Sequence, residues 1–289
     1  MISLVLVRKL EVRIAACYNK DPLLIKYIQD PTTDMHRDAC MDMFFLSKDL
    51  YAKHKDYFKK TARDSAKNQF VFPQTYGSNY VNCAKAIWKS MKQRKFMCGE
   101  LTMFEHLEKH GVKERGDCRQ GVDPIPGSFE AHLRKVERIM WDKRFTVWTA
   151  WKKRRWEEYQ RDGGLSMLTG FAVNGLFSKN DVICYPVQGS AFHCLLWSLV
   201  EIDAWLRAKK MRSLILGEIH DAGQFSVHPA ELQEFLTKVK EVMTKKLLER
   251  YKWINIPLDV EADVAPVDQD WYQCKLWVQD SSNNWSPAA

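Results

Sequence analysis

The sequence predicts an α+β fold in which helices come first along the chain and a small antiparallel sheet comes later. Apolar residues recur with helical periodicity up to about residue 160. Beyond Lys210 the pattern changes to short extended segments rich in Leu, Ile and Val. With 46% hydrophobic residues, a chain of 289 residues has enough apolar material for a core. Disorder throughout the chain is therefore excluded.

Turn residues and prolines divide the helical part into elements. Asp30–Thr33 marks a turn and the start of a helix, and the helical pattern then continues until Pro73. The stretch 115–128 is rich in Gly and Pro and predicts a loop. In chain order we expect an extended segment and a helix within 10–30, helices over 35–72, 78–95 and 129–160, short extended pieces over 165–177, and a helix over 190–209.

A hairpin is predicted within residues 214–227, with His220 and Asp221 at its tip. A carboxylate at such a tip is presented beyond the sheet, where it can take part in chemistry. An aspartate there can equally serve only to favour the turn, and the spacing alone leaves both interpretations open. A helix over 229–251 and a strand over 256–263 complete the expected elements.

The charge balance favours an anionic partner. There are 44 Lys and Arg against 36 Asp and Glu, a formal charge of +8. Between residues 134 and 162 the bases alternate with tryptophans, which suits phosphates and stacked bases but is also typical of a solvated helix face. No apolar run approaches the roughly 20 residues of a membrane span, and the N-terminus lacks the features of a signal peptide. We therefore expect a cytoplasmic protein without a membrane partner.

Several segments resemble motifs of family A DNA polymerases, the DNA polymerase I family. The hairpin with Ile219-His220-Asp221 and the later segment 256–261 resemble the C-terminal end of the palm. Residues 185–191 match the P-x-Q-G-[ST]-A segment that opens a palm helix. Residues 63–77 resemble the fingers helix that receives the incoming nucleotide, and 10–14 resemble the second half of the first palm motif, D-Y-S-Q-[IL]-E-x-R. The motifs follow in the family's order and cover almost the whole chain.

The resemblance implies a right-hand polymerase fold with helical fingers and a palm that carries the small sheet. Residues 1–32 would be a truncated N-terminal part of the palm, 33–170 the fingers and 171–289 the C-terminal palm. The implied activity is DNA-templated addition of dNTPs to a primer 3′-hydroxyl in replication, with two Mg²⁺ ions and primer-template DNA. Phe-Val-Phe-Pro at 70–73 is most like bacteriophage members, which implies the cytoplasm of a host cell.

The fingers segment supplies most of the expected nucleotide contacts. Arg63 and Lys67 are four residues apart, so they share a helix face that can meet a triphosphate, although an exposed basic face is the plainer interpretation. By resemblance Phe72 and Tyr76 face the sugar and the nascent base pair, with core packing as the alternative. The family has one residue fewer between the Lys and the Tyr-Gly, so Phe70 competes with Phe72 for the sugar position.

The resemblance assigns the remaining contacts to the palm and to the start of the fingers. Asp221 would be the metal ligand, and with Arg63 and Lys67 it would form the catalytic group. Gln188 would read minor-groove acceptors near the primer end, with a helix-capping or surface glutamine as the alternative. His36 would contact the phosphates, and His220 would support the turn or contact the primer end. Glu11 would lie under the sugar and bond the Tyr76 hydroxyl. Arg13, the structural neighbour of Glu11, would lie on the DNA side.

The chain departs from the family at the metal site. The metal-binding Asp of the first palm motif stands five residues before the Glu, where this sequence has Leu6, and Ala222 replaces the usual acid after His-Asp. We also expect the thumb and the first palm strand to be absent or incomplete. The chain alone should then be inactive or weak, and an N-terminal polymerase chain would supply the missing Asp and the thumb. The alternative is a catalytically silent DNA-binding remnant.

Overall fold

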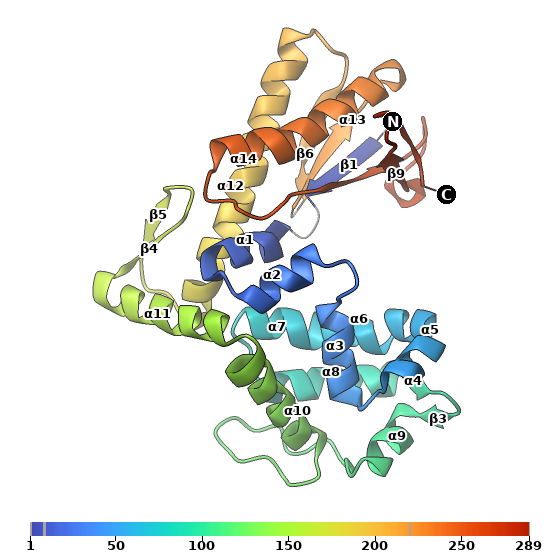
Figure 1. Ribbon diagram of the computed structural model, residues 1–289, viewed down its shortest axis with the longest axis vertical. Coiled ribbons are helices and arrows are strands. Elements are labelled where there is room, and N and C mark those ends of the chain that lie inside the picture. The colour runs from blue at the N-terminus through green and yellow to red at the C-terminus, as the bar shows by residue number, and fades with distance from the viewer. Residues whose placement is uncertain (1, 8–9, 220, 289) are drawn as a thin grey trace. The chain divides into compact units, whose positions relative to one another are not determined.

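The structure is a computed structural model that describes residues 2–7, 10–219 and 221–288. The chain divides into two compact units, which we name by their content. The sheet unit comprises Met1–Lys20, Asp162–Gly175 and Tyr185–Ala289, and the helical unit comprises Asp21–Arg161 and Leu176–Cys184 (Figure 1). Helix α12 (Lys179–Ala208) contributes its first residues to the helical unit and the rest to the sheet unit.

The sheet unit is built on a six-stranded antiparallel sheet with the strand order β10-β9-β8-β1-β7-β6. The α+β class with a small antiparallel sheet is thus confirmed. The strands are β1 (Ile2–Val7), β6 (Leu214–Ile219), β7 (Ala222–Ser226), β8 (Val260–Val264), β9 (Lys275–Gln279) and β10 (Trp285–Pro287).

The first palm strand, which we expected to be absent or incomplete, is present as β1 in the interior of this sheet. Val5 pairs with Gly223 of β7 on one side and with Ala262 of β8 on the other. Both Val5 and Val7 are buried, because apolar β-branched residues at alternate positions fit one covered face of a sheet. The expectation was wrong because it judged the strand by its missing acid, whereas pairing depends on the backbone and the apolar pattern.

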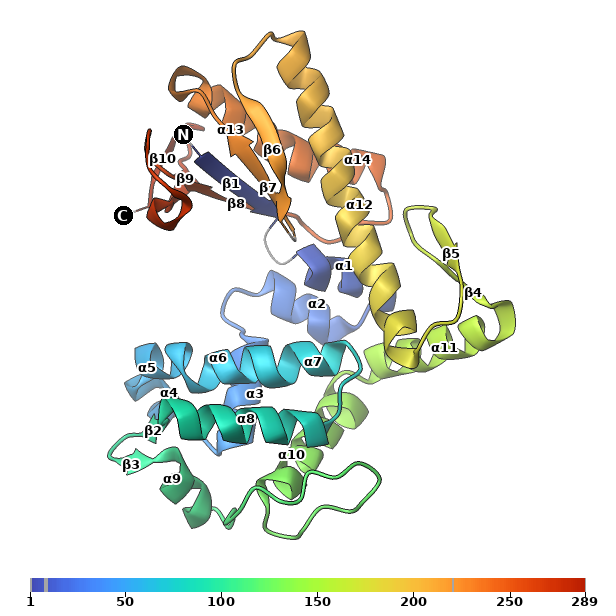
Figure 2. The ribbon, with the colours of Figure 1, turned by 180° about the vertical axis from the view of Figure 1, so that it is seen from behind.

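Helices α12 and α13 (Leu232–Glu241) cover one face of the sheet (Figures 1 and 2). The ring of Phe225 in β7 meets Phe235 of α13 edge-on, with 5.0 Å between centroids. A Cβ on Gly223 would come within 3.0 Å of Leu199 of α12, so the helix packs closely on the strand. The further elements around this sheet are η3 (Pro229–Glu231), η4 (Val242–Lys246), α14 (Leu247–Arg250) and η5 (Trp271–Gln273).

A small hairpin is tied to two helices by one tyrosine. The hairpin consists of β4 (Gly164–Ser166) and β5 (Ala172–Asn174). The Tyr18 hydroxyl on α1 (Leu10–Asn19) shares a 2.8 Å hydrogen bond with Ser190 of α12 and accepts one from the Leu168 amide. Residues 10–19 are thus helical, and the extended segment expected at the start of 10–30 is not formed.

The helical unit consists of short helices that begin at capping side chains. Asp21, Asp34, Ser47 and Ser128 each accept hydrogen bonds from the first turn of a helix. The elements are α2 (Pro22–Gln29), α3 (Met35–Phe44), α4 (Lys48–Lys53), α5 (Lys55–Lys60), α6 (Ala62–Ala66), η1 (Lys67–Val71), α7 (Phe72–Thr75), α8 (Tyr80–Arg94), β2 (Met97–Cys98), β3 (Leu101–Thr102), α9 (Met103–Lys109), α10 (Phe129–Arg138), η2 (Ile139–Arg144) and α11 (Thr146–Asp162).

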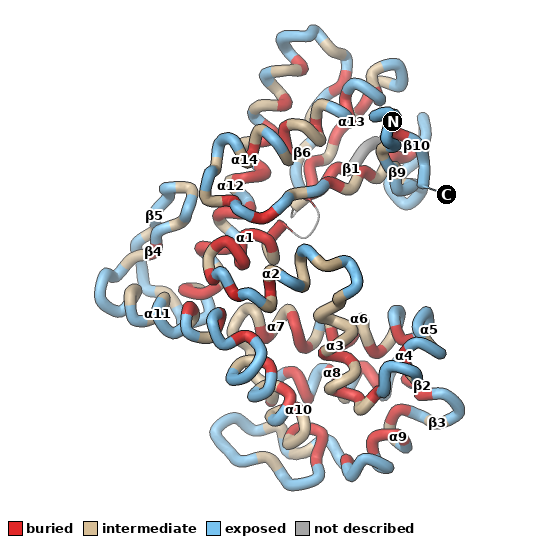
Figure 3. Tube along the Cα trace, in the orientation of Figure 1, coloured by how far each residue is buried: buried red, intermediate tan, exposed pale blue. Residues whose placement is uncertain are grey.

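The single helix expected over 35–72 is broken, and it does not stop at Pro73. Phe45 ends α3 in the left-handed conformation (φ 52°), after which Ser47 caps a new helix. Pro73 lies in the first turn of α7, where a residue without an N–H is tolerated. Buried segments run along α3, α6, α8 and α10 (Figure 3), and the fully buried rings of this core are Phe44, Phe58, Phe70, Phe96 and Phe129.

Across the described ranges, every helix is too short or too polar to cross a bilayer.

We expect Phe225→Ala to lower the free energy of unfolding of the sheet unit by about 3–5 kcal/mol, because it removes a fully buried ring and leaves a cavity. Phe192→Ala on the exposed side of α12 is the matched control, since Phe192 is 41% exposed, and it should change the value by less than about 1 kcal/mol. Urea unfolding followed by circular dichroism measures both. Equal losses in the two variants would contradict this account of the core.

Candidate functional site

Three of the predicted fingers residues lie together in the helical unit. Lys67 lies on η1, Phe72 begins α7 and His36 lies in the first turn of α3. The Lys67 Nζ is 5.3 Å from the centroid of the Phe72 ring, and the His36 ring meets the same ring edge-on at 5.5 Å. Two basic groups thus flank one half-exposed aromatic ring, and we call these residues the His36–Lys67–Phe72 cluster.

Arg63 is fixed beside this cluster by an ion pair. One oxygen of Asp34 accepts from the His36 and Arg37 amides at 3.0 and 3.1 Å, which caps α3. The other oxygen accepts from the Arg63 Nε at 2.7 Å. Burial tends to raise the pKa of Asp34, but the hydrogen bonds from Arg63 and the Arg37 amide outweigh it and lower that pKa below its ordinary value. Asp34 therefore stays ionised and holds Arg63 next to His36.

A π-helical turn brings Lys67 and Phe72 onto the same face although they are five residues apart. The Phe72 amide donates to the Lys67 carbonyl, the i→i+5 bond of a π-helix. One extra residue in a helix is absorbed by such a turn, and this accounts for the extra residue noted in the sequence. Phe70 points into the core and is fully buried. The geometry therefore puts Phe72 rather than Phe70 beside Lys67, and Tyr76 follows as the C-cap of α7.

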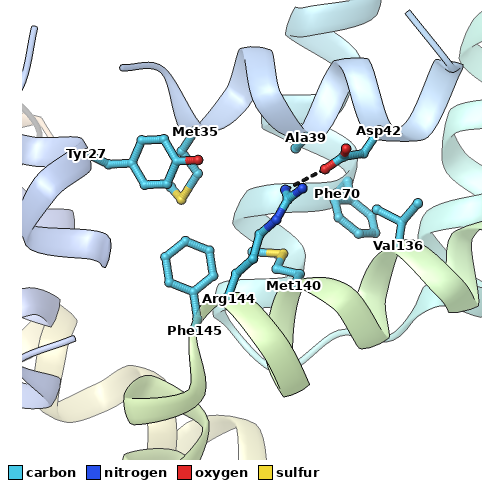
Figure 4. A pocket seen from close by; sticks show the side chains of 9 residues that line it. All are labelled: Tyr27, Met35, Ala39, Asp42, Phe70, Val136, Met140, Arg144 and Phe145. Carbon is cyan, nitrogen blue, oxygen red and sulfur yellow. Dashed lines mark hydrogen bonds and ion pairs between the residues drawn. The ribbon is translucent and has the colours of Figure 1, made fainter. Parts of the chain in front are cut away.

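A narrow cavity lies within the helical unit, between α3, η1 and η2 (Figure 4). Its volume is about 20 Å³, which is room for one water molecule and far too small for a nucleotide. Arg144 extends across it to an ion pair with Asp42. The cavity is thus a small gap between packed helices. It is lined by Tyr27, Met35, Ala39, Asp42, Phe70, Val136, Met140, Arg144 and Phe145.

Asp221 lies at the end of the β6–β7 hairpin, directly before Ala222. His220, the other residue predicted at the tip, is outside the described residues. Leu6 of β1 pairs with Ala222 on one side and with Glu261 of β8 on the other. The two positions at which the resemblance leads us to expect further acids are therefore neighbours across two strands, and both hold apolar residues in this chain.

The residues present do not fit a centre for two Mg²⁺ ions. Such a centre needs several carboxylate oxygens that converge on both ions. Within residues 2–7, 10–219 and 221–288, no group of three or more His, Cys, Asp or Glu side chains is placed to hold a metal ion. Asp221 is the acid that remains of the expected set, with Glu261 as the cross-strand neighbour of Leu6, and we derive no step through a metal bound by this chain alone.

The other predicted palm residues have different surroundings. Gln188 is exposed on α12, so its amide is accessible to a ligand. Glu11 lies half-buried in the first turn of α1. Arg13, expected near the DNA, is buried and donates from Nη1 to the carbonyl of Pro257, so within the sheet unit it joins α1 to the segment before β8.

One residue of the cluster's surroundings was missed in the sequence. Asp34 orders Arg63 and the start of α3, yet we had singled out only His36 from this segment. An acid directly before a helix pattern is a recognised N-cap signal, and it marked this position. Its pairing with Arg63, 29 residues away, has no counterpart in the local pattern.

This chain is similar to DNA polymerases of bacteria and of a bacteriophage. Residues 136–273 match the family model described as DNA polymerase family A. DNA polymerase I of Streptococcus pneumoniae R6 is 25% identical over 92% of this chain and 25% of its own length. DNA polymerase I of Aquifex aeolicus is 24% identical over 88% of this chain and 37% of its length, and the DNA polymerase of Bacillus phage SP01 is 30% identical over 30% of this chain and 10% of its length.

A solved structure shares the fold. The POL domain of Pol1 from M. smegmatis, in complex with DNA primer-template and dNTP, superposes with a TM-score of 0.59 and 18% identity over 90% of this chain and 38% of that chain. The resemblance to family A DNA polymerases is thus confirmed. The chain spans less than two-fifths of the length of each of these proteins.

We expect Asp34→Asn to lower the free energy of unfolding by about 1 kcal/mol at pH 7, because it removes a half-buried ion pair and keeps an equally good N-cap. The pKa of Asp34 is lowered in the folded chain, so its stabilisation is complete above the ordinary value of 3.8 and is lost as the pH falls through the folded-state pKa. The difference in free energy of unfolding between Asp34→Asn and wild type should therefore shrink below about pH 4.

Urea unfolding at pH 7 and pH 3 measures this difference. Asp117→Asn removes a more exposed pair with Arg119 and serves as the control, with an expected change of less than about 0.5 kcal/mol. If the difference in free energy of unfolding between Asp34→Asn and wild type is the same at both pH values, the carboxylate charge of Asp34 does not stabilise the fold.

Proposed function

We propose that this chain, which resembles family A DNA polymerases, is the nucleotide-binding and C-terminal catalytic part of an enzyme that adds dNTPs to a primer on a DNA template. The observation that carries the proposal is the His36–Lys67–Phe72 cluster, with Arg63 held beside it. In this proposal the helical unit acts as the fingers, for which the resemblance implies residues 33–170. The sheet unit acts as the palm and contacts the primer-template.

The cluster has the chemistry that a nucleoside triphosphate requires. Ammonium and guanidinium groups form short charge-assisted hydrogen bonds with phosphate oxygens, and Lys67, Arg63 and His36 would provide them. The Phe72 ring restrains the Lys67 ammonium through a cation–π contact and offers an apolar face to the sugar. Tyr76, one turn further on, would lie against the nascent base pair, and Glu11 of the palm would exclude a ribose 2′-hydroxyl.

Catalysis then requires an acid that this chain lacks at the expected position. Two-metal nucleotidyl transfer needs Asp221 together with a second carboxylate, and the position for that carboxylate is Leu6. We propose that an N-terminal polymerase chain supplies it. Because β1 occupies the place between β7 and β8, the partner's acid must approach the hairpin end from outside the sheet.

A second candidate function is a DNA-binding remnant without chemistry. The paired positions of Leu6 and Ala222 favour it, because both further acids of the expected metal site have been replaced by apolar residues. Nucleotide and DNA binding would persist in such a remnant, so only restoration of synthesis by a partner separates the two candidates.

Primer extension with Mg²⁺ and dNTPs tests the proposed function. The chain alone should be slower by at least about 10²-fold than a mixture with an N-terminal polymerase segment that carries the D-Y-S-Q-type aspartate, because one preorganised charge-stabilising group is worth about that much. Asp221→Ala should abolish extension by the mixture. Glu249→Ala, an exposed acid on α14, should leave it unchanged.

Robust extension by the isolated chain would refute the argument from the missing acid. Failure of every partner segment to restore synthesis, with DNA binding intact, would identify the remnant.

The π-helical turn gives a second test, in which only the helix register changes. Deletion of exposed Asn68 should convert η1 into α-helix and keep Lys67 and Phe72 on one face, now four residues apart, so affinity for a fluorescent dNTP should stay within about threefold. Insertion of an Ala after Asn68 instead turns Phe72 by about 100° relative to Lys67 and should weaken binding by at least about tenfold. Equal affinities in the two variants would contradict the role of the cluster.

A further inference from the structure

A lysine that the proposed function leaves unused caps the helix in front of Tyr76. The Lys152 Nζ on α11 donates to the Gln74 carbonyl at 3.0 Å. The same ammonium lies 3.3 Å from the ring centroid of Trp141 and 5.4 Å from that of Trp148. The Gln74 carbonyl also accepts from the Gly77 amide at 3.3 Å, and a cation at the C-terminal end of a helix adds a further hydrogen bond and complements the helix dipole.

The Gln74 side chain is held as tightly as its carbonyl. Gln74 is 2% exposed in α7. Its Oε1 accepts from the Trp141 Nε1 at 2.7 Å, and its Nε2 donates to a carboxylate oxygen of Glu137. Residues from α10, η2 and α11 thus converge on one residue of α7, and we call Gln74, Glu137, Trp141 and Lys152 the α7 cap network.

The turn that follows is fixed from a second side. The Tyr76 carbonyl accepts a hydrogen bond from the Cys184 thiol at 3.6 Å. Gly77 has a φ of +89°, and a Cβ there would lie 2.2 Å from the Asn180 Oδ1, so the turn has room for glycine only. Tyr76 therefore stands between the cap network before it and the start of α12 after it.

We propose that Lys152 is a positioning residue whose ammonium group, by capping α7, holds Tyr76 in the conformation that binds the nucleotide. The inference rests on the proposed function, in which Tyr76 lies against the nascent base pair. Its consequence is that nucleotide affinity follows the protonation state of one lysine that does not touch the nucleotide.

The surroundings of Lys152 put that protonation change within the ordinary pH range. Burial under the indole rings lowers the pKa of Lys152 to about 7, while Cys184 and Glu137 raise it and Lys179 lowers it. Burial also raises the pKa of Glu137, against the hydrogen bond from Gln74. As the pH rises through 7, Lys152 loses its charge, the charge-assisted bond to Gln74 becomes an ordinary one, and the cap weakens.

The test is the affinity of the full chain for a fluorescent dNTP between pH 6 and pH 9. Wild type should bind about five- to tenfold more weakly at pH 8.5 than at pH 6, the effect of exchanging a charged for a neutral hydrogen bond. Lys152→Met should bind weakly at all pH values and lose most of this slope. Lys152→Arg, which keeps a charge that does not titrate, should recover affinity and show a flat profile.

Lys153→Met is the matched control, because Lys153 is the next residue on α11 and its side chain is 81% exposed. It should reproduce the wild-type profile. A Lys152→Met variant that keeps the wild-type slope, or a Lys152→Arg variant that recovers nothing, would overturn the inference. Urea unfolding of each variant at pH 7 shows which changes in affinity come from lost folding.

A second readout separates the inference from the proposed function. In the nucleotide-free chain, tryptophan emission should titrate near pH 7 in wild type and not in Lys152→Met, because the ammonium charge lies against Trp141 and Trp148. Absence of this titration would refute the protonation change at Lys152. A wild-type chain that binds no nucleotide at any pH would refute the proposed function and with it the link to Tyr76, whereas nucleotide binding that ignores Lys152 refutes the inference alone.

Discussion

A helix with 3.6 residues per turn places side chains on one face only when they are three or four residues apart, and the segment after Ala62 has to align a pair that is five apart. The π-helical turn η1 solves this by widening one turn, so that Lys67 and Phe72 meet while Phe70 fills the core. In the proposed function, His36, Arg63 and Tyr76 can contact the same nucleotide as Lys67 and Phe72 only if this alignment holds. The cap network behind α7 then fixes the far end of the same helical segment.

Charge is distributed differently in the two units. In the helical unit, a basic group is held in place by a single acid, as Arg63 is by Asp34. In the sheet unit, the one acid predicted at the hairpin end is Asp221. Strand β1 is hydrogen-bonded to β7 on one side and to β8 on the other, and this backbone pairing does not depend on the side chain at position 6. A fold of this kind can therefore persist after its metal chemistry has been lost or transferred to another chain.

The sequence predicted the parts that local pattern determines. The β6–β7 hairpin and β8 follow from alternating apolar residues around a turn, and Arg63 and Lys67 follow from their helical spacing. The break at Phe45 could not be predicted, because a non-glycine residue in the left-handed conformation has no local signature. We expected the first palm strand to be absent or incomplete because position 6 lacks an acid, but β1 forms without it.

For the candidate site, the sequence showed that one residue was inserted between Lys67 and Tyr76 but not where the helix absorbs it. Phe70 and Phe72 are both aromatic, and only the packing of the core distinguishes them. The pairing of Asp34 with Arg63 and the contacts of Lys152 join residues that are distant in sequence, so no local pattern contains them. Local rules thus identify which side chains carry charge, and tertiary packing decides which of them point the same way.

The two outer strands of the sheet differ in how they meet solvent. Strand β10 contains Pro287, which has no N–H to offer to a further strand. Strand β6, at the other edge, carries exposed Leu214 and Leu216, and no strand in the described part of the chain pairs with its outer side. An unprotected apolar edge of this kind templates the addition of another strand. In concentrated preparations this edge is the exposed site for strand addition, which a charged residue at position 214 or 216 would disfavour.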